Sequence, residues 1–353
     1  MSRTMSGEDR LIARHFAPLA THRGALGLTD DAAFTAVPAG HELVVTADAV
    51  IGGVHFFPDD PPDLVARKAL RVNLSDLAAK GAKPLGFLLT LALPKGTGDA
   101  WLARFTKGLA ADAKAFRCPL LGGDSVRSPD AIMISVTAFG TLPRGSMVRR
   151  RGAKPGDVVM VTGTIGDGAL GLAVRQAKRL PWGLSRAQAK HLTQRYLLPQ
   201  PRNAVADAVR RHASAAMDVS DGLAGDLAKL CRVSGVSADI AMADVPLSPA
   251  AKAALRHEPS LQSRILGGGD DYEIVCTVPV RRVKAFAAQA RKAGVRVSAV
   301  GRIVKGTVPP RILDARGEAV DLQSASFSHF LRGKTTTREG AHGRDNEGKR
   351  DDL

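Results

Sequence analysis

Residues 72–79 read Val72-Asn73-Leu74-Ser75-Asp76-Leu77-Ala78-Ala79, a largely apolar helical segment that contains a single aspartate. The segment belongs to a predicted helix over Asp63–Lys80, in which Asp63 can cap the start and Gly81 can end the last turn. Aspartate has only modest helix propensity and no capping role in the middle of a helix. The position of Asp76 therefore indicates a functional carboxylate.

Working outward from this helix, apolar strand-like runs alternate with helical patterns along the chain. The predicted strands are Leu43–Ala47, Phe87–Leu93, Ile132–Phe139, Val158–Thr162, Ile274–Val278 and Val295–Val300. The other predicted helices are Asp99–Phe116, Asp167–Ala177, Arg202–His212, Asp221–Ser234 and Val280–Ala293. This mixture predicts an α/β or α+β fold, without fixing the order of the strands.

The length of 353 residues predicts two domains. A polar, turn-rich stretch from Arg144 to Asp157 precedes a new strand, so we place the boundary there. The expected divisions are an N-terminal domain over 1–148, a C-terminal domain over 149–332 and a tail over 333–353. The tail is polar and lacks apolar periodicity, which predicts disorder.

Composition excludes several classes of protein. The chain has no run of 18 apolar residues and no signal-peptide pattern at its N-terminus, so we expect a cytoplasmic protein without a membrane span. Cys118, Cys231 and Cys276 are isolated, which favours buried thiols over disulfides or a cysteine zinc site.

The formal net charge of +16 predicts anionic partners, either nucleic acid or highly charged small molecules. The basic residues are scattered, and their densest clusters, Arg149–Arg151 and Arg210-Arg211, have no interleaved aromatic residues. Stacking aromatics are the usual signature of single-strand binding. We therefore expect no specific nucleic-acid partner.

Six groups of aspartates stand in small, glycine-rich or serine-rich surroundings. They are Asp30-Asp31, Thr46-Ala47-Asp48, Ser75-Asp76, Gly122-Gly123-Asp124, Asp218-Val219-Ser220-Asp221-Gly222 and Gly269-Asp270-Asp271. Any one aspartate at a strand end can be a cap or a turn residue. Six groups spread over both halves are harder to explain in that way, and carboxylate oxygens with few histidines favour Mg²⁺ over Zn²⁺.

The familiar nucleotide-binding motifs are absent. Residues 328–335 resemble a P-loop but lack its first glycine and lead into the polar tail. The loop Gly163–Gly168 follows a strand and precedes a helix, so its backbone N–H groups could cradle a phosphate. A tight strand–helix turn explains the same residues equally well.

Several motifs in order along the chain carry a family resemblance. They are Leu11–Phe16, Asp30-Asp31, Asp48 with Gly53–Phe56, Val72–Ala79, Gly122–Asp124, Gly152–Asp157, Asp218–Leu223, Gly269–Glu273 and His329-Phe330. The series resembles the thiamine-monophosphate kinase family, in the superfamily of aminoimidazole-ribonucleotide synthetase, from about Gly7 to Phe330.

The resemblance implies a two-domain α/β enzyme, dimeric through its N-terminal half, that uses ATP to convert thiamine monophosphate to thiamine diphosphate. It implies that several Mg²⁺ ions are held by Asp31, Thr46, Asp48, Asp76, Asp124, Asp218 and Asp221. It implies that ATP is contacted by Gly123, Asp124, Arg150 and Ser220, and the thiamine substrate by His55, Asp270 and Phe327.

The chain departs from the family pattern at a few of these positions. Ala47 stands where the family has a hydroxyl side chain, and Asp270 replaces a glutamate. Phe327 replaces a larger aromatic residue but keeps a stacking face. The expected chemistry needs no general base, because the second pKa of a phosphate monoester is about 6 and the acceptor is already anionic.

Three other readings remain open from the sequence. One is another ATP-dependent enzyme of the superfamily, such as an aminoimidazole-ribonucleotide or selenophosphate synthetase. A second is a basic nucleic-acid-binding protein, suggested by the net charge. A third is a homologue without catalytic activity, suggested by Ala47 and Asp270.

Overall fold

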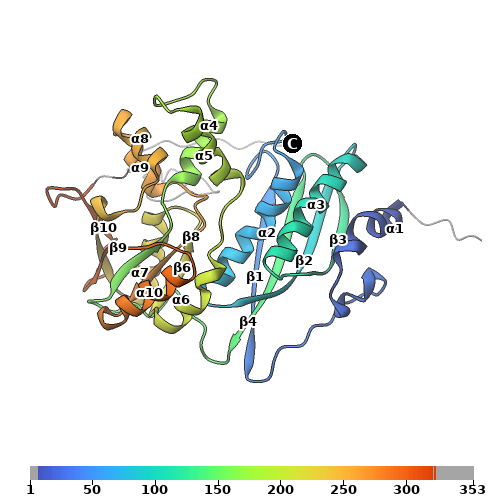
Figure 1. Ribbon diagram of the computed structural model, residues 1–353, viewed down its shortest axis with the longest axis horizontal. Coiled ribbons are helices and arrows are strands. Elements are labelled where there is room, and N and C mark those ends of the chain that lie inside the picture. The colour runs from blue at the N-terminus through green and yellow to red at the C-terminus, as the bar shows by residue number, and fades with distance from the viewer. Residues whose placement is uncertain (1–6, 321, 323–353) are drawn as a thin grey trace, which may run out of the picture.

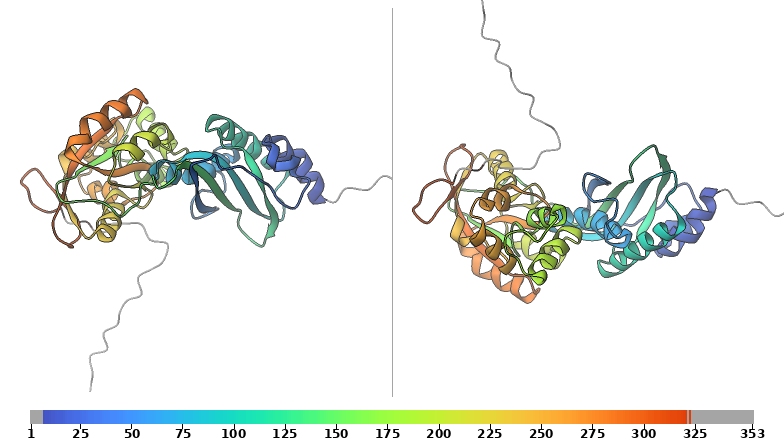
Figure 2. Two further views of the ribbon diagram at one scale, coloured as in Figure 1. Left: turned by 90° about the horizontal axis from the view of Figure 1, so that it is seen from below. Right: turned by 90° about the horizontal axis from the view of Figure 1, so that it is seen from above.

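The computed structural model describes residues 7–320 and residue 322, which form two α/β lobes side by side (Figure 1). Views from below and above show the lobes joined along one long axis (Figure 2). The predicted disordered tail and Phe327 lie outside the described residues.

The first lobe is built on a four-stranded sheet. Its strands are β1 (His41–Ile51), β2 (Lys83–Pro94), β3 (Leu120–Ser128) and β4 (Met133–Pro143). Their order is β1-β4-β2-β3, with β4 antiparallel to both of its neighbours and β2 parallel to β3. Helices α2 (Pro62–Ala79) and α3 (Asp99–Ala115) cover one face of this sheet (Figure 1).

The N-terminal segment forms short helical pieces. They are α1 (Gly7–Leu11), a π-helical turn (Ile12–Phe16) and 3₁₀ turns at Ala17–Leu19 and Arg23–Leu28. Residues from this segment line a cavity against the sheet face that α2 and α3 leave uncovered.

The core of the first lobe follows from the amphipathic pattern of α2. Leu70, Leu74 and Leu77 recur at helical spacing and are fully buried. They belong to one apolar cluster with Phe87 of β2 and Ile134 of β4. Burial of this stripe fixes α2 across the sheet, and it thereby fixes the position of Asp76 relative to β1.

The second lobe contains a six-stranded sheet of order β10-β7-β9-β5-β8-β6, antiparallel except for the β10–β7 pair. Its strands are β5 (Val158–Thr162), β6 (Ala215–Val219), β7 (Ser237–Ala241), β8 (Glu273–Val278), β9 (Val297–Val304) and β10 (Arg311–Leu313).

Helices pack on both faces of the second sheet. They are α4 (Asp167–Gln176), α5 (Arg186–Leu197), α6 (Ala206–His212), α7 (Leu223–Ser234), α8 (Pro249–His257), α9 (Leu261–Gly267) and α10 (Val283–Lys292). Short 3₁₀ turns lie at Asn203–Val205, Met242–Asp244 and Val280–Arg282. One core unites α4, α7, α8 and α9 with the sheet, and a second core lies under α6 and α10.

The last turn of α2 belongs to the second lobe as well as to the first. Ala78 and Ala79 are fully buried in the core beneath α6 and α10, against Ala216 of β6 and Ile274 of β8. One helix therefore joins the cores of both lobes.

Each predicted strand and helix lies on an observed element, with differences of a few residues at the ends. The predicted N-cap role of Asp63 is wrong. Pro61 occupies that position without a side-chain cap, and Asp63 in the first turn pairs with Arg104 of α3 instead. Gly81 follows the C-cap with a φ of +76°, as a glycine that ends a helix does.

The three cysteines are buried, as predicted, and burial raises the pKa of each thiol, to about 12 for Cys118 and Cys276 and about 11 for Cys231. Over residues 7–320 and 322, no helix has the length and apolar character that crossing a bilayer requires.

Candidate active site

Strand β1 and the end of α2 bring three of the predicted metal ligands together. Thr46 Oγ1 donates a hydrogen bond to Asp76 Oδ2 at 2.5 Å, and the Asp48 backbone N–H donates to Asn73 Oδ1 at 3.0 Å. Asp76 lies in the last turn of α2, not mid-helix as predicted. A carboxylate is disfavoured at this end by the helix dipole, which strengthens the case for a functional role.

The second lobe contributes two further carboxylates at the end of β6. Asp218 is buried within the strand, and Asp221 follows in the turn before α7. The buried Asp226 accepts hydrogen bonds from the backbone N–H groups of Ser220 and Asp221, and Lys229 pairs with both Asp221 and Asp226. These contacts hold the turn that presents Ser220 and Asp221.

The carboxylates of the two lobes lie close enough to affect each other's ionisation. Desolvation, together with the charges of Asp76 and Asp221, raises the pKa of Asp48 to about 6. Burial, followed by the charge of Asp76, raises the pKa of Asp218 well above its ordinary value. Asp48, Asp76, Asp218 and Asp221 therefore form one acidic group, called here the junction carboxylates.

Basic side chains border the junction carboxylates. A cavity of about 390 Å³ is lined by Thr46, Asp76, Lys80, Arg149 and Arg150, among others. Burial and then the charge of Arg150 lower the pKa of Lys80 to about 8, although Asp218 and Asp76 act in the opposite direction. Arg150, one of the predicted ATP contacts, thus lies in the same cavity as two predicted metal ligands.

Asp31, Gly123 and Asp124 lie elsewhere, in the wall of a cavity of about 700 Å³. The backbone N–H groups of Asp31 and Ser125 donate hydrogen bonds to the carboxylates of Asp30 and Asp124, both at 2.8 Å. Gly123 is required here, because a Cβ at this position would lie 1.8 Å from the carbonyl oxygen of Leu89.

The seven predicted metal ligands are therefore divided between two places. Side chains alternate along a strand, so Thr46 and Asp48 point to the face that α2 covers, whereas Asp124 lines the cavity on the other face. Asp124 is also three strand spacings from β1, about 14 Å. In the part of the chain that the structure describes, no three histidine, cysteine, aspartate or glutamate side chains are gathered closely enough to hold a metal ion.

His55 and Asp270, the two described residues predicted to bind the thiamine substrate, are joined through Lys68 of α2. The Lys68 ammonium donates to the carbonyl oxygen of His55 at 3.0 Å and lies 3.4 Å from Asp270 Oδ2. His55 Nδ1 accepts a hydrogen bond from the Ile51 backbone N–H at 3.1 Å. Sequence reasoning missed Lys68, since a lysine in a helix carries no signal of its own.

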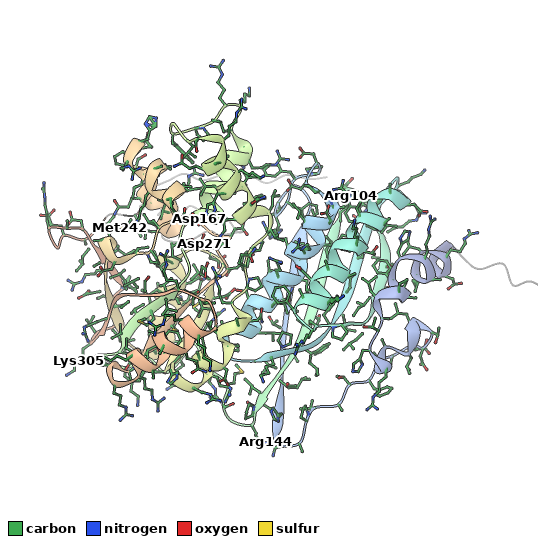
Figure 3. The ribbon with its side chains drawn as sticks, viewed as in Figure 1. Arg104, Arg144, Asp167, Met242, Asp271 and Lys305 are labelled. Atoms are coloured by element: carbon green, nitrogen blue, oxygen red, sulfur yellow. The ribbon has the colours of Figure 1, made fainter. Side chains whose placement is uncertain are left out.

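The loop Gly163–Gly168 is a structural turn and not a phosphate cradle. The backbone N–H groups of Gly166 and Gly168 donate to the Asp271 carboxylate at 2.7 and 2.9 Å. Asp271 is buried beside Asp167 in the interior of the second lobe (Figure 3). These two donors are therefore not available to a phosphate.

Comparisons with known proteins agree with this architecture. Residues 29–142 match the family described as AIR synthase related protein, N-terminal domain, and residues 154–311 match its C-terminal domain. The chain is 45% identical over 301 residues to the thiamine-monophosphate kinase of Caulobacter vibrioides, covering 84% of this chain and 83% of that protein.

Solved structures of the same family superpose on most of the chain. The thiamine-monophosphate kinase of Stenotrophomonas maltophilia is 36% identical, with a TM-score of 0.76 and coverage of 88% of this chain and 96% of that one. AaThiL complexed with AMPPCP and TMP is 28% identical, with a TM-score of 0.73 and coverage of 93% and 100%. This chain is a member of the thiamine-monophosphate kinase family, within the AIR synthase related proteins.

Proposed function

We propose that this chain transfers the γ-phosphoryl group of ATP to the phosphate of thiamine monophosphate, which gives ADP and thiamine diphosphate. Membership of the thiamine-monophosphate kinase family supports this activity, and a relative has been solved with AMPPCP and TMP. The structural observation that carries the proposal is the convergence of four carboxylates from both lobes beside Arg150 and Lys80.

Several Mg²⁺ ions are part of the proposal. The described residues gather no three ligating side chains, but Mg²⁺ is usually held by one or two carboxylates together with substrate phosphates and water. The junction carboxylates and the Thr46 hydroxyl offer only oxygen atoms, which are the ligands that Mg²⁺ prefers. Burial, and after it their mutual repulsion, raises the pKa of Asp48 and of Asp218, so a divalent cation is favoured among them. Bound Mg²⁺ would neutralise the negative charge of phosphate oxygens. Asp31 and Asp124, in the wall of the cavity of about 700 Å³, are also proposed Mg²⁺ ligands.

The remaining chemistry consists of placing two polyanions in line. Arg150 and Lys80 border the junction carboxylates and can bind phosphate oxygens of ATP. Gly123 and Ser220 are further proposed ATP contacts. The acceptor phosphate is itself the nucleophile, so no side chain has to remove a proton. Positioning and charge neutralisation are then the main contributions of the protein.

We also propose a cytoplasmic homodimer formed through the N-terminal half, with domains divided near residue 148. Large apolar side chains are exposed in this half, with exposed fractions of 42% for Leu43, 53% for Val45 and 45% for Val126. A second copy could cover this surface. The buried, unpaired thiols suit a reducing compartment.

The test is product formation by the purified chain with ATP and Mg²⁺. Thiamine monophosphate, thiamine, selenide and no acceptor are compared, with ADP and thiamine diphosphate measured by chromatography. We expect equal amounts of both products with thiamine monophosphate alone, and loss of turnover when a chelator removes the metal. Turnover with selenide, or ATP hydrolysis without diphosphate formation, would instead support the alternative enzymes of the superfamily.

A further inference from the structure

Lys68 is a nearly buried lysine in the middle of helix α2, at the junction of the two lobes. Its side chain is only 4% exposed. Burial lowers the pKa of Lys68, opposed by the charges of Asp270 and Asp60. Burying an ammonium group is costly, and an apolar side chain would fill the same space at lower cost. The presence of a charge here therefore calls for a role that charge can serve.

The contacts of Lys68 point to that role. Its Nζ donates to the carbonyl oxygen of His55 at 3.0 Å, in the loop that follows β1 of the first lobe. The same Nζ faces Asp270 Oδ2 at 3.4 Å, in the loop before β8 of the second lobe. One ammonium thus connects the two residues proposed to contact the thiamine substrate, although they come from different domains.

Tyr196 of α5 completes this arrangement from the second lobe. Its hydroxyl donates to the same His55 carbonyl oxygen at 3.1 Å, and Lys68 Nζ lies 3.9 Å from the centre of its ring. The ring packs edge-on against Phe57 at 6.2 Å, in the His55 loop. The His55 loop is therefore held by one donor from each lobe.

The backbone of Asp270 is in an uncommon conformation. Its φ is +71°, in the left-handed region that non-glycine residues rarely adopt. Its backbone N–H donates to the carbonyl oxygen of Ser220 at 2.9 Å, so its loop is tied to the proposed ATP contact. Lys68 then fixes the direction of the carboxylate.

We propose that Lys68, assisted by Tyr196, is a positioning residue for the acceptor substrate. It orients the Asp270 carboxylate and the His55 loop so that both face the same bound molecule. This inference rests on the proposed function, because it assigns these residues to the acceptor and not to ATP. It predicts a selective effect on acceptor binding.

The test compares steady-state kinetics of Lys68→Met, Lys68→Arg and Tyr196→Phe with the unaltered chain. Met has a side chain of similar length without a charge or a hydrogen-bond donor, whereas Arg keeps the charge and the donor. We expect Lys68→Met to raise KM for thiamine monophosphate about tenfold or more, as loss of a buried charged partner does, with KM for ATP within about twofold. Lys68→Arg should recover part of this loss, and Tyr196→Phe should cause a smaller rise.

Lys107→Met is the matched control, because Lys107 is an exposed lysine on the neighbouring helix α3. Its two KM values should not change. Asp270→Asn and the double variant with Lys68→Met complete a cycle. If the two side chains act as a unit, their effects on acceptor KM should be far less than multiplicative. Independent effects would overturn the coupling.

Binding of thiamine monophosphate is measured in parallel by calorimetry, so that a variant with low kcat is still informative. If the unaltered chain neither binds nor phosphorylates thiamine monophosphate, the proposed function fails and this inference with it. If the unaltered chain is active but Lys68→Met changes both KM values equally, or neither, only the inference fails. If Lys68→Met does not fold, the KM values of Tyr196→Phe and Lys68→Arg decide. A rise in KM for thiamine monophosphate without a rise in KM for ATP supports the inference, and equal or absent changes overturn it.

Discussion

Thr46 Oγ1 lies 2.5 Å from Asp76 Oδ2, so a hydroxyl and a carboxylate join strand β1 to the last turn of helix α2. Asp76 is also close enough to raise the pKa of Asp48 and of Asp218. A single aspartate thus connects the proposed metal ligands of the first lobe to those of the second. Its charge is the property that the following substitution removes.

Asp76→Asn should reduce turnover about a hundredfold or more while the fold stays intact, because the amide keeps one acceptor oxygen but loses the charge that attracts Mg²⁺. Asp221→Asn should behave alike. Asp63→Asn, on the same helix but paired with Arg104 at the surface, is the control and should leave turnover unchanged. The measurement is kcat over a Mg²⁺ titration, with melting curves. Near-normal turnover of both variants at low millimolar Mg²⁺ would argue against the metal proposal.

Gly168→Ala should weaken acceptor binding. A Cβ on Gly168 would lie 2.3 Å from the carbonyl oxygen of Asp270, so the Asp270 loop must move. We expect KM for thiamine monophosphate to rise about tenfold, as misplacement of a substrate contact does, with a smaller change for ATP. Gly98→Ala is the control, since a Cβ there meets no atom within 4 Å. Equal changes in both KM values would contradict the assignment of this loop to the acceptor.

Asp167→Asn should destabilise the protein in a pH-dependent way. Burial acts to raise the pKa of Asp167, but hydrogen bonds from His191, Ser248 and Thr164 outweigh it and lower the pKa below its ordinary value of 3.8. The carboxylate is therefore stabilising above pH 3.8, and that contribution is lost as pH falls through the lowered pKa.

We expect the variant to lose about 2 kcal/mol of unfolding free energy at pH 7, as loss of a charged hydrogen-bond acceptor does. The difference from the unaltered chain should shrink as the pH falls below about 4. Urea unfolding at pH 7, 4 and 3 measures it, with Asp244→Asn as an exposed control. A loss of unfolding free energy that is the same at all three pH values would show that the charge of Asp167 does not contribute to stability.

Nucleic-acid binding should be weak and independent of sequence. The net charge of +16 supplies an electrostatic attraction, and exposed side chains such as Arg281, Arg282 and Lys284 near the start of α10 contribute to it. Such binding falls steeply with salt and reads no bases. We expect dissociation constants above about 1 µM at physiological salt, measured with duplexes of unrelated sequence. Sub-micromolar preference for one sequence would revive the nucleic-acid-binding alternative.

The helices and strands that could be predicted are those in which the pattern of apolar residues in the sequence matches the side chains that are buried in the structure. Strands such as Val158–Thr162 are β-branched runs, and α2 and α3 carry long apolar stripes. Strand β3 was missed because Gly122 and Gly123 interrupt it, and β6 because it has few β-branched residues. Helix α5 had a usable signal, since Ser185 and Gln188 form a capping box.

The candidate site could be predicted as a set of residues but not as an arrangement. The aspartates were recognisable from their surroundings in the sequence. Which face of the first sheet Asp48 and Asp124 occupy depends on strand register, where a shift of one residue reverses the direction of a side chain. Lys68 contacts Asp270 and Tyr196, which lie more than a hundred residues away in the sequence, so its role depends on how the two lobes meet.

Helix α2 places Leu70 and Leu74 in the core of the first lobe and Ala79 in the core of the second. The boundary between the two domains in the sequence therefore does not separate two independently stable units. A chain cut after β4 would leave the second lobe with an open apolar surface and the first with an exposed helix end. Heating should accordingly melt both lobes in one calorimetric transition, and a change that loosens either core should lower that shared melting temperature.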